Sequence, residues 1–79
     1  MYIKSDGDVF INLPDADKKD YSIKFYKEDG TYLFDIKNIK ETGLTLDKTN
    51  FLQSGWYNFE LLDNTKLVER HKFYIAKMF

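Results

Sequence analysis

Hydrophobic and polar residues alternate at every second position along most of this chain. Successive side chains of a β-strand point to opposite faces, so this period predicts strands with one buried face. The inward-facing sets, in chain order, are Val9, Ile11 and Leu13; Tyr21, Ile23 and Phe25; Phe34 and Ile36; Leu44 and Leu46; and Tyr57, Phe59 and Leu61. Residues 68–75 predict a sixth strand. Because no segment has a helical pattern longer than one turn, the chain predicts an all-β fold, either an antiparallel sandwich or a small open barrel.

The dipeptide Asp29-Gly30 predicts a two-residue turn between the second and third strands, because glycine accepts the positive φ of a type I′ turn. With this turn at the tip, the expected cross-strand pairs are Tyr26 with Leu33, Phe25 with Phe34, Lys24 with Asp35, and Ile23 with Ile36. Apolar pairs then share one face and a pair of opposite charges lies on the other. A slip by one residue would mix the two faces, so the pattern favours this register.

A loop around residues 64–66 predicts a closing hairpin. Its register places four pairs opposite each other: Trp56 with Tyr74, Glu60 with Arg70, Phe59 with His71, and Leu61 with Glu69. The last pair would direct a carboxylate toward the core, where an unpaired charge is costly. We therefore expect Glu69 at a strand end or beside a β-bulge.

Composition then narrows the class of protein. The 79 residues predict a single β-sandwich domain over residues 1–79, with an ordered core over residues 9–77. Seven Phe, six Tyr and one Trp supply the large apolar surfaces that so small a domain must bury. The 12 basic and 13 acidic residues lack the basic excess typical of nucleic-acid-binding proteins. The absence of cysteine excludes disulfides, and no apolar run reaches the ~18 residues of a membrane helix. We expect neither nucleic-acid partners nor membrane insertion.

Residues 45–61 carry a short motif in which Leu52, Ser54, Gly55 and Tyr57 precede an alternating strand. This segment resembles the C-terminal sorting domains of Bacteroidetes type IX secretion substrates, which are small immunoglobulin-like sandwiches. The similarity extends over residues 9–77 and includes the Asp29-Gly30 turn. It implies an immunoglobulin-like sandwich of six to seven antiparallel strands with a role in secretion or at the cell surface. Residues 76–79 are more apolar than the basic tail of that family.

The same segment has a physical interpretation that does not depend on the family. Ser54-Gly55 is a turn, after which Tyr57 enters the next strand on its buried face. Its ring is expected in the core, with its hydroxyl bonded to a backbone group of the preceding crossover, as in a tyrosine corner. Phe51 and Leu52 are expected to plug one open end of the sandwich.

No set of residues predicts catalysis or a metal site. His71 is the only histidine; it shares a strand face with Glu69 but lies between two basic residues, which is typical of a solvated edge. The acidic residues from Asp15 to Asp20 do not form a calcium loop, because Lys19 occupies its fifth position and Asp20 its sixth. We therefore expect a protein that is not an enzyme and that needs no cofactor.

Several large apolar residues are expected on the outward faces of the strands. They are Phe10, Tyr26, Leu33, Trp56, Leu62 and Tyr74, of which Tyr26, Leu33, Trp56 and Tyr74 form the candidate binding face. Contiguous aromatic residues on a sheet often mark an interaction surface. We predict a non-catalytic interaction or accessory module that contacts a protein partner or a second copy of itself.

Two alternatives stay open for these residues. They could form a carbohydrate-binding module that stacks sugars on its aromatic rings, or they could pack under loops, termini or the other sheet. The compartment is equally open: an excised sorting-type domain would be extracellular or at the cell surface, and any other origin favours the cytoplasm.

Overall fold

The computed structural model describes residues 1–5, 7–51 and 53–76, which form seven strands and two short 3-10 helices. The elements are β1 (Tyr2–Ile3), β2 (Val9–Asn12), η1 (Ala16–Lys18), β3 (Tyr21–Lys27), β4 (Tyr32–Ile39), β5 (Gly43–Leu46), η2 (Lys48–Asn50), β6 (Gly55–Asp63) and β7 (Lys66–Ile75). Strands β2 to β7 are the six that the sequence predicts, and β1 adds a seventh.

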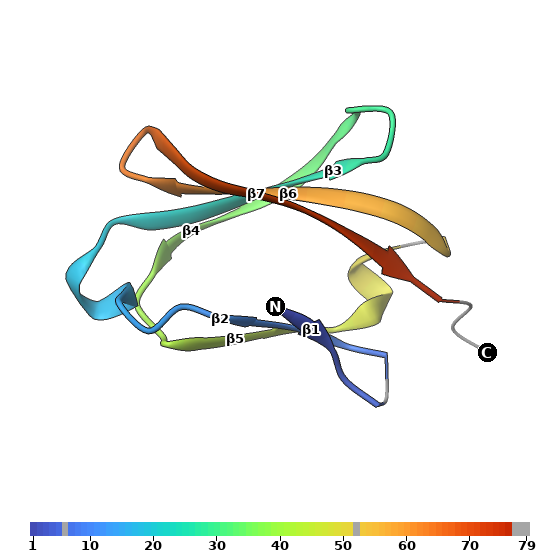
Figure 1. Ribbon diagram of the computed structural model, residues 1–79, viewed down its shortest axis with the longest axis horizontal. Helices are drawn as coiled ribbons and strands as arrows, with labels where there is room; N and C mark the ends of the chain where they lie inside the picture. Colours follow the sequence, from blue (N-terminus) through green and yellow to red (C-terminus); the bar gives the residue numbers. More distant parts are fainter. Residues whose placement is uncertain (6, 52, 77–79) are drawn as a thin grey trace.

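The strands form two antiparallel sheets that face each other as layers (Figure 1). The smaller sheet has the order β1-β2-β5 and the larger one β4-β3-β6-β7. Taken in chain order, these correspond to strands A-B-E and C′-C-F-G of an immunoglobulin-type sandwich. The prediction of an all-β, antiparallel, immunoglobulin-like sandwich is confirmed. Strands β3 and β6 are the two central strands of the larger sheet.

The inward faces of both sheets share one apolar core. Phe25, on the central strand β3, is fully buried and lies at the centre of a cluster of rings. Its centroid is between 4.8 and 6.3 Å from those of Phe34, Phe51, Phe59 and Phe73. Aromatic pairs at these separations add to the free energy of burial, which helps a domain this small to stay folded. Tyr57 and Phe59 are both buried, as the alternating pattern predicts.

The first hairpin differs from its prediction near the tip. Three expected pairs are present, Ile23 with Ile36, Lys24 with Asp35 and Phe25 with Phe34. Tyr26, however, faces Tyr32 rather than Leu33, because the register shifts by one residue between Phe25 and Tyr26. The prediction of a Tyr26–Leu33 pair is therefore wrong.

The turn itself explains this shift. The Lys27 N–H donates a hydrogen bond to the Thr31 carbonyl (2.8 Å), and the Lys27 carbonyl accepts one from the Gly30 N–H (2.9 Å), so the loop has three residues, 28–30, rather than two. Gly30 has a φ of +92°, whereas Asp29 does not have the positive φ that a type I′ turn needs. The Asp29 carboxylate instead accepts a hydrogen bond from the Thr31 backbone N–H (2.9 Å), which stabilises the longer loop.

The closing hairpin has the four predicted pairs, but its loop is shorter than expected: Lys66 pairs with Asp63, so the loop holds residues 64 and 65 rather than 64–66. Trp56 faces Tyr74, Phe59 faces His71, Glu60 faces Arg70 and Leu61 faces Glu69. The pairing then shifts by one residue after Leu61, so that Leu62 faces Leu67 and Val68 is left over as a bulge. Glu69 lies beside this irregularity and is exposed, as predicted, so its charge stays in water.

Candidate functional site

The outer face of the larger sheet carries a pair of exposed aromatic rings. Trp56 on β6 and Tyr74 on β7 are directly opposite in the ladder, and their side chains are 46% and 48% exposed. Their ring centroids are 5.3 Å apart and the rings meet edge to face, at 65°. Both residues sit on a regular part of the ladder, and the contact between the rings favours this arrangement.

Lys72 covers part of this pair. Its Nζ lies 5.1 Å from the centroid of the Trp56 ring and 3.2 Å from Glu28 Oε2 in the loop of the first hairpin. Lys72 is on β7, and Glu28 directly follows β3. Strands β3 and β7 are the two neighbours of β6 in the sheet. The ion pair therefore reaches across β6 and holds its ammonium group close to the indole, a favourable cation–π position.

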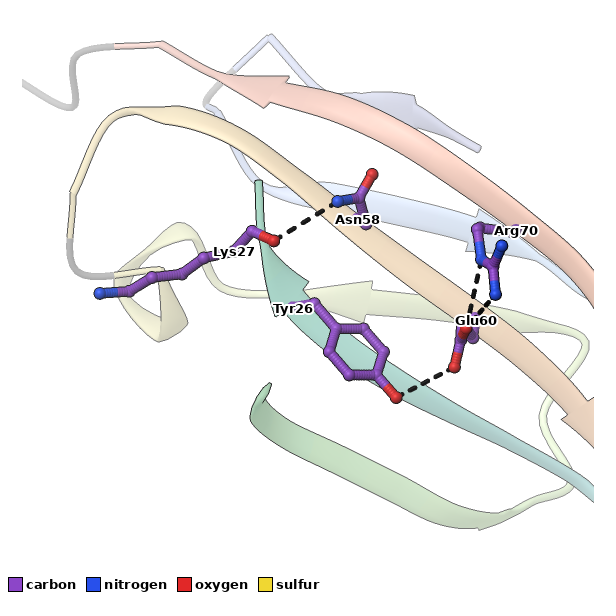
Figure 2. A network of polar contacts seen from close by, with 5 residues as sticks. All are labelled: Tyr26, Lys27, Asn58, Glu60 and Arg70. Carbon is purple, nitrogen blue, oxygen red and sulfur yellow. Dashed lines mark hydrogen bonds and ion pairs between the residues drawn. The ribbon is translucent and has the colours of Figure 1, made fainter. Parts of the chain in front are cut away.

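Tyr26 lies on the same face and is held in place by a polar network (Figure 2). Its hydroxyl donates a hydrogen bond to Glu60 Oε1 (3.0 Å), and Arg70 donates to Glu60 Oε2 from Nε (3.2 Å) and Nη2 (2.6 Å). The hydrogen bonds from Arg70 lower the pKa of Glu60. The pKa of Tyr26 is raised, mainly because its hydroxyl is partly removed from water and to a smaller extent because it donates to Glu60. Both oxygens of the carboxylate are occupied, so this network orients side chains rather than offering a reactive group.

Tyr32 belongs to this face although the sequence does not single it out. Its ring meets that of Tyr26 at 6.0 Å and 70°, and its hydroxyl donates to Asp35 (2.9 Å). A three-residue interpretation of the turn would have placed Tyr32 opposite Tyr26, so the missing signal was the loop length. We call the four aromatic residues Tyr26, Tyr32, Trp56 and Tyr74 the aromatic face.

Leu33, the remaining candidate, is not part of the aromatic face. It is partly buried and packs against the core, so the expectation that it points outward is wrong. The bulge in β4 changes the alternation at this point: Leu33 has no partner in the ladder and turns toward the end of the sandwich. The other two expected outward residues, Phe10 and Leu62, are half-buried. Phe10 stacks against Tyr2 on the smaller sheet, at 5.1 Å.

The tyrosine corner is confirmed. The hydroxyl of Tyr57 donates a hydrogen bond of 2.6 Å to the backbone carbonyl of Gln53, in the crossover that precedes β6. Phe51 is completely buried and meets Tyr57 edge to face at 5.1 Å, so it closes this end of the sandwich as predicted. Leu52, which was expected to share that role, lies outside the described residues.

The remaining candidates for chemistry are solvated. His71 Nε2 lies 3.4 Å from Glu69 Oε2, and both side chains are about half exposed. Asp20 is an exposed partner of Lys40 (3.5 Å). Within residues 1–5, 7–51 and 53–76, no three His, Asp or Glu side chains gather in the way a metal ion requires. In the same residues, no helix combines the length and apolar character needed to cross a membrane.

Comparisons with protein-family models, with curated proteins and with solved structures found no match to this chain.

Proposed function

We propose that this chain is a non-catalytic interaction module and that the aromatic face binds a protein partner or a second copy of the chain. The observation that carries the proposal is the Trp56–Tyr74 pair, two large rings that are each about half exposed and lie side by side on the sheet. Trp and Tyr are the residues that most often dominate binding energy in protein interfaces. Fixed rings also lose little conformational entropy on binding, which favours affinity.

The edges of the same sheet are less suited to binding than its face. In β4 the ladder is irregular at Leu33 and at Asn38, whose φ is +56°, and in β7 it is irregular at Val68. Bulges of this kind hinder the addition of another strand, and so do charged residues along an edge, such as the exposed Glu69 on β7. The side chains of the face are therefore better candidates for contact than the backbone of the edges.

The double variant Trp56→Ala, Tyr74→Ala tests this proposal against Tyr2→Ala as a matched control. Tyr2 is 57% exposed but lies on the smaller sheet, so its loss removes a similar ring from a different surface. Sedimentation velocity over a range of concentrations measures self-association, and affinity capture from cell-envelope extracts measures retention of partners. We expect the double variant, once shown to be folded, to lose an association that Tyr2→Ala retains. A folded double variant that keeps every association would refute the role of this face.

Carbohydrate binding is the second candidate, and a groove beside Trp56 favours it. The groove has a volume of about 380 Å³ and lies between the loop of the first hairpin and the start of β6. Besides the indole, it presents the side chains of Glu28, Asp29, Gln53 and Ser54. Lys27 also lines the groove, so its walls are mostly polar around one indole, which suits a sugar stacked on the ring with hydrogen bonds to the neighbouring groups. Titration with a broad glycan panel should quench the fluorescence of Trp56 if this candidate is correct, and unchanged fluorescence throughout would exclude it.

A role in secretion or at the cell surface is proposed from the resemblance to the sorting domains. The experiment is to fuse residues 1–79 to the carboxyl end of a reporter protein in a bacterium that has type IX secretion. Export of the reporter would support the role, and its retention in the periplasm at normal expression would argue against it.

A further inference from the structure

A small apolar pocket lies at the end of the sandwich where the first hairpin approaches the crossover into β6. Its volume is about 220 Å³, and its apolar walls come from Leu33, Phe34 and Tyr57. Three local features create it. The bulge in β4 turns Leu33 toward the core, the Tyr57–Gln53 hydrogen bond fixes the far wall, and Phe34 is held by stacking on Phe25 at 4.8 Å. The pocket is therefore a consequence of fixed structure.

The rim of this pocket is polar and includes no carboxylate. It is formed by the side chains of Lys27, Asn50 and Gln53. Asn50 uses its Nδ2 to bond the Asp47 carbonyl (2.9 Å), whereas the Lys27 ammonium and the Gln53 carboxamide form no hydrogen bond or ion pair with a described residue. The pKa of Asp29 is lowered chiefly by its hydrogen bond from Thr31 and to a smaller extent by the charge of Lys27, so the ammonium group lies within electrostatic range of that carboxylate. In Figure 2 the Lys27 side chain extends away from β6, on the side where η2 lies. Two donors that form no hydrogen bond with a described residue, at the mouth of an apolar pocket, suit an anionic group attached to an apolar one.

We propose that this pocket binds the C-terminal residue of a partner polypeptide when that residue is apolar. Its volume fits one side chain of the size of Phe or Leu, since a cavity of about 150 Å³ already accommodates benzene. The terminal carboxylate would then accept hydrogen bonds from Lys27 and Gln53.

We assign the carboxylate to a polypeptide rather than to a small acid because the pocket opens into a second groove that can hold the residues before the terminus. The groove beside Trp56 continues from it and shares Lys27, Gln53 and Tyr57 with it. Glu28 and Asp29 line that groove. Glu28 is paired with Lys72 and Asp29 accepts a hydrogen bond from Thr31, but both carboxylates are exposed, so a basic residue just before the apolar terminus complements their charge. This inference goes beyond the proposed function, since the pocket walls are separate from the Trp56–Tyr74 pair.

The test compares the peptide acetyl-Gly-Ser-Lys-Phe as a free acid, the same peptide as its C-terminal amide, and phenylpropionate. Binding is measured on the full chain from shifts of the backbone amides of Leu33, Phe34 and Gln53 in NMR spectra, up to about 5 mM ligand. We expect the acid to bind about fivefold or more tightly than the amide, because only the acid forms charge-assisted bonds. Phenylpropionate should bind more weakly than the acid, because it does not reach the groove.

Two exposed lysines provide the matched variants. Lys27→Gln should abolish the preference for the acid, and Lys37→Gln, on the adjacent strand β4, should leave it unchanged. Equal affinity for acid and amide, equal effects of the two variants, or phenylpropionate binding as tightly as the peptide would each overturn the proposal, as would the absence of any shift. The ratio of acid to amide affinity depends on Lys27, so it should be the same in the double variant Trp56→Ala, Tyr74→Ala. Loss of peptide binding at the pocket can therefore be told apart from loss of binding at the aromatic face.

Discussion

Replacing Tyr57 by Phe tests whether the tyrosine corner stabilises the sandwich through its hydroxyl. The substitution keeps the ring, which meets Phe51 at 5.1 Å and Phe73 at 5.9 Å, so it opens no cavity. It removes one hydrogen bond, the 2.6 Å bond from the hydroxyl to the Gln53 carbonyl. That bond joins the start of β6 to the crossover that brings the chain from the smaller sheet to the larger one.

The expected loss follows from where the two partners lie. A typical intramolecular hydrogen bond contributes about 0.5–1.5 kcal/mol to the free energy of unfolding. Tyr57 is buried, but Gln53 is exposed, so water can bond its carbonyl in the variant. The larger cost of a buried group without a partner therefore does not apply, and we expect a loss of about 1 kcal/mol. In a domain of this size, 1 kcal/mol lowers the melting temperature by about 4–8 °C.

Urea unfolding followed by circular dichroism measures this difference, provided that the slope with denaturant is unchanged. Tyr74→Phe is the control, because Tyr74 is exposed and its hydroxyl forms no hydrogen bond with a described residue. If both variants unfold at the same urea concentration as the parent protein, the corner hydrogen bond does not stabilise the fold and the reasoning is wrong.

Three further predictions follow from the core, the polar network and the first turn. Phe51→Ala should cost about 3–5 kcal/mol in calorimetry, because the completely buried ring leaves a cavity; a loss below about 1 kcal/mol would show that Phe51 does not close the sandwich. The hydrogen bonds from Arg70 lower the pKa of Glu60 below its usual 4.5, so the stability that Glu60 contributes is present above that pH and is lost as the pH falls below it. The difference in free energy of unfolding between the parent protein and Glu60→Gln should therefore shrink in acid. A difference that stays constant with pH would contradict this reasoning. The Cβ added by Gly30→Ala meets no neighbouring atom, but the alanine must adopt a φ of +92°. We expect urea unfolding to show a free energy of unfolding lower by about 1 kcal/mol, and an unchanged value would show that the loop rearranges to avoid this φ.

Much of the fold could be predicted from local pattern alone. The period of two in residues 57–61 directs Tyr57, Phe59 and Leu61 inward, and all three are buried. The same reasoning predicted the four cross-strand pairs of the closing hairpin and placed Glu69 at a strand end or beside a bulge, of which the structure has the bulge. These predictions hold because register is determined by which side chains must leave water, and that information is contained in the order of residues.

The candidate site was only partly predictable. Trp56 and Tyr74 are exposed neighbours as expected, since their partnership depends only on the register of one hairpin. Tyr32 and Leu33 were exchanged in the prediction because Asp29-Gly30 is compatible with both a two-residue and a three-residue loop. The hydrogen bond from Thr31 to Asp29 favours the longer loop, and a shift of one residue moves each side chain to the other face.

The sequence by itself therefore determined strands β2 to β7 and most of their buried faces, because each of these depends on residue type and near neighbours. Only the tertiary structure decided which ends of the strands meet. It brought Lys27, Leu33 and Gln53 around one pocket and carried Lys72 across β6 to Glu28. The physical reason is that such contacts join segments tens of residues apart, and their geometry depends on bulges and loops whose energies differ by little from those of the alternatives.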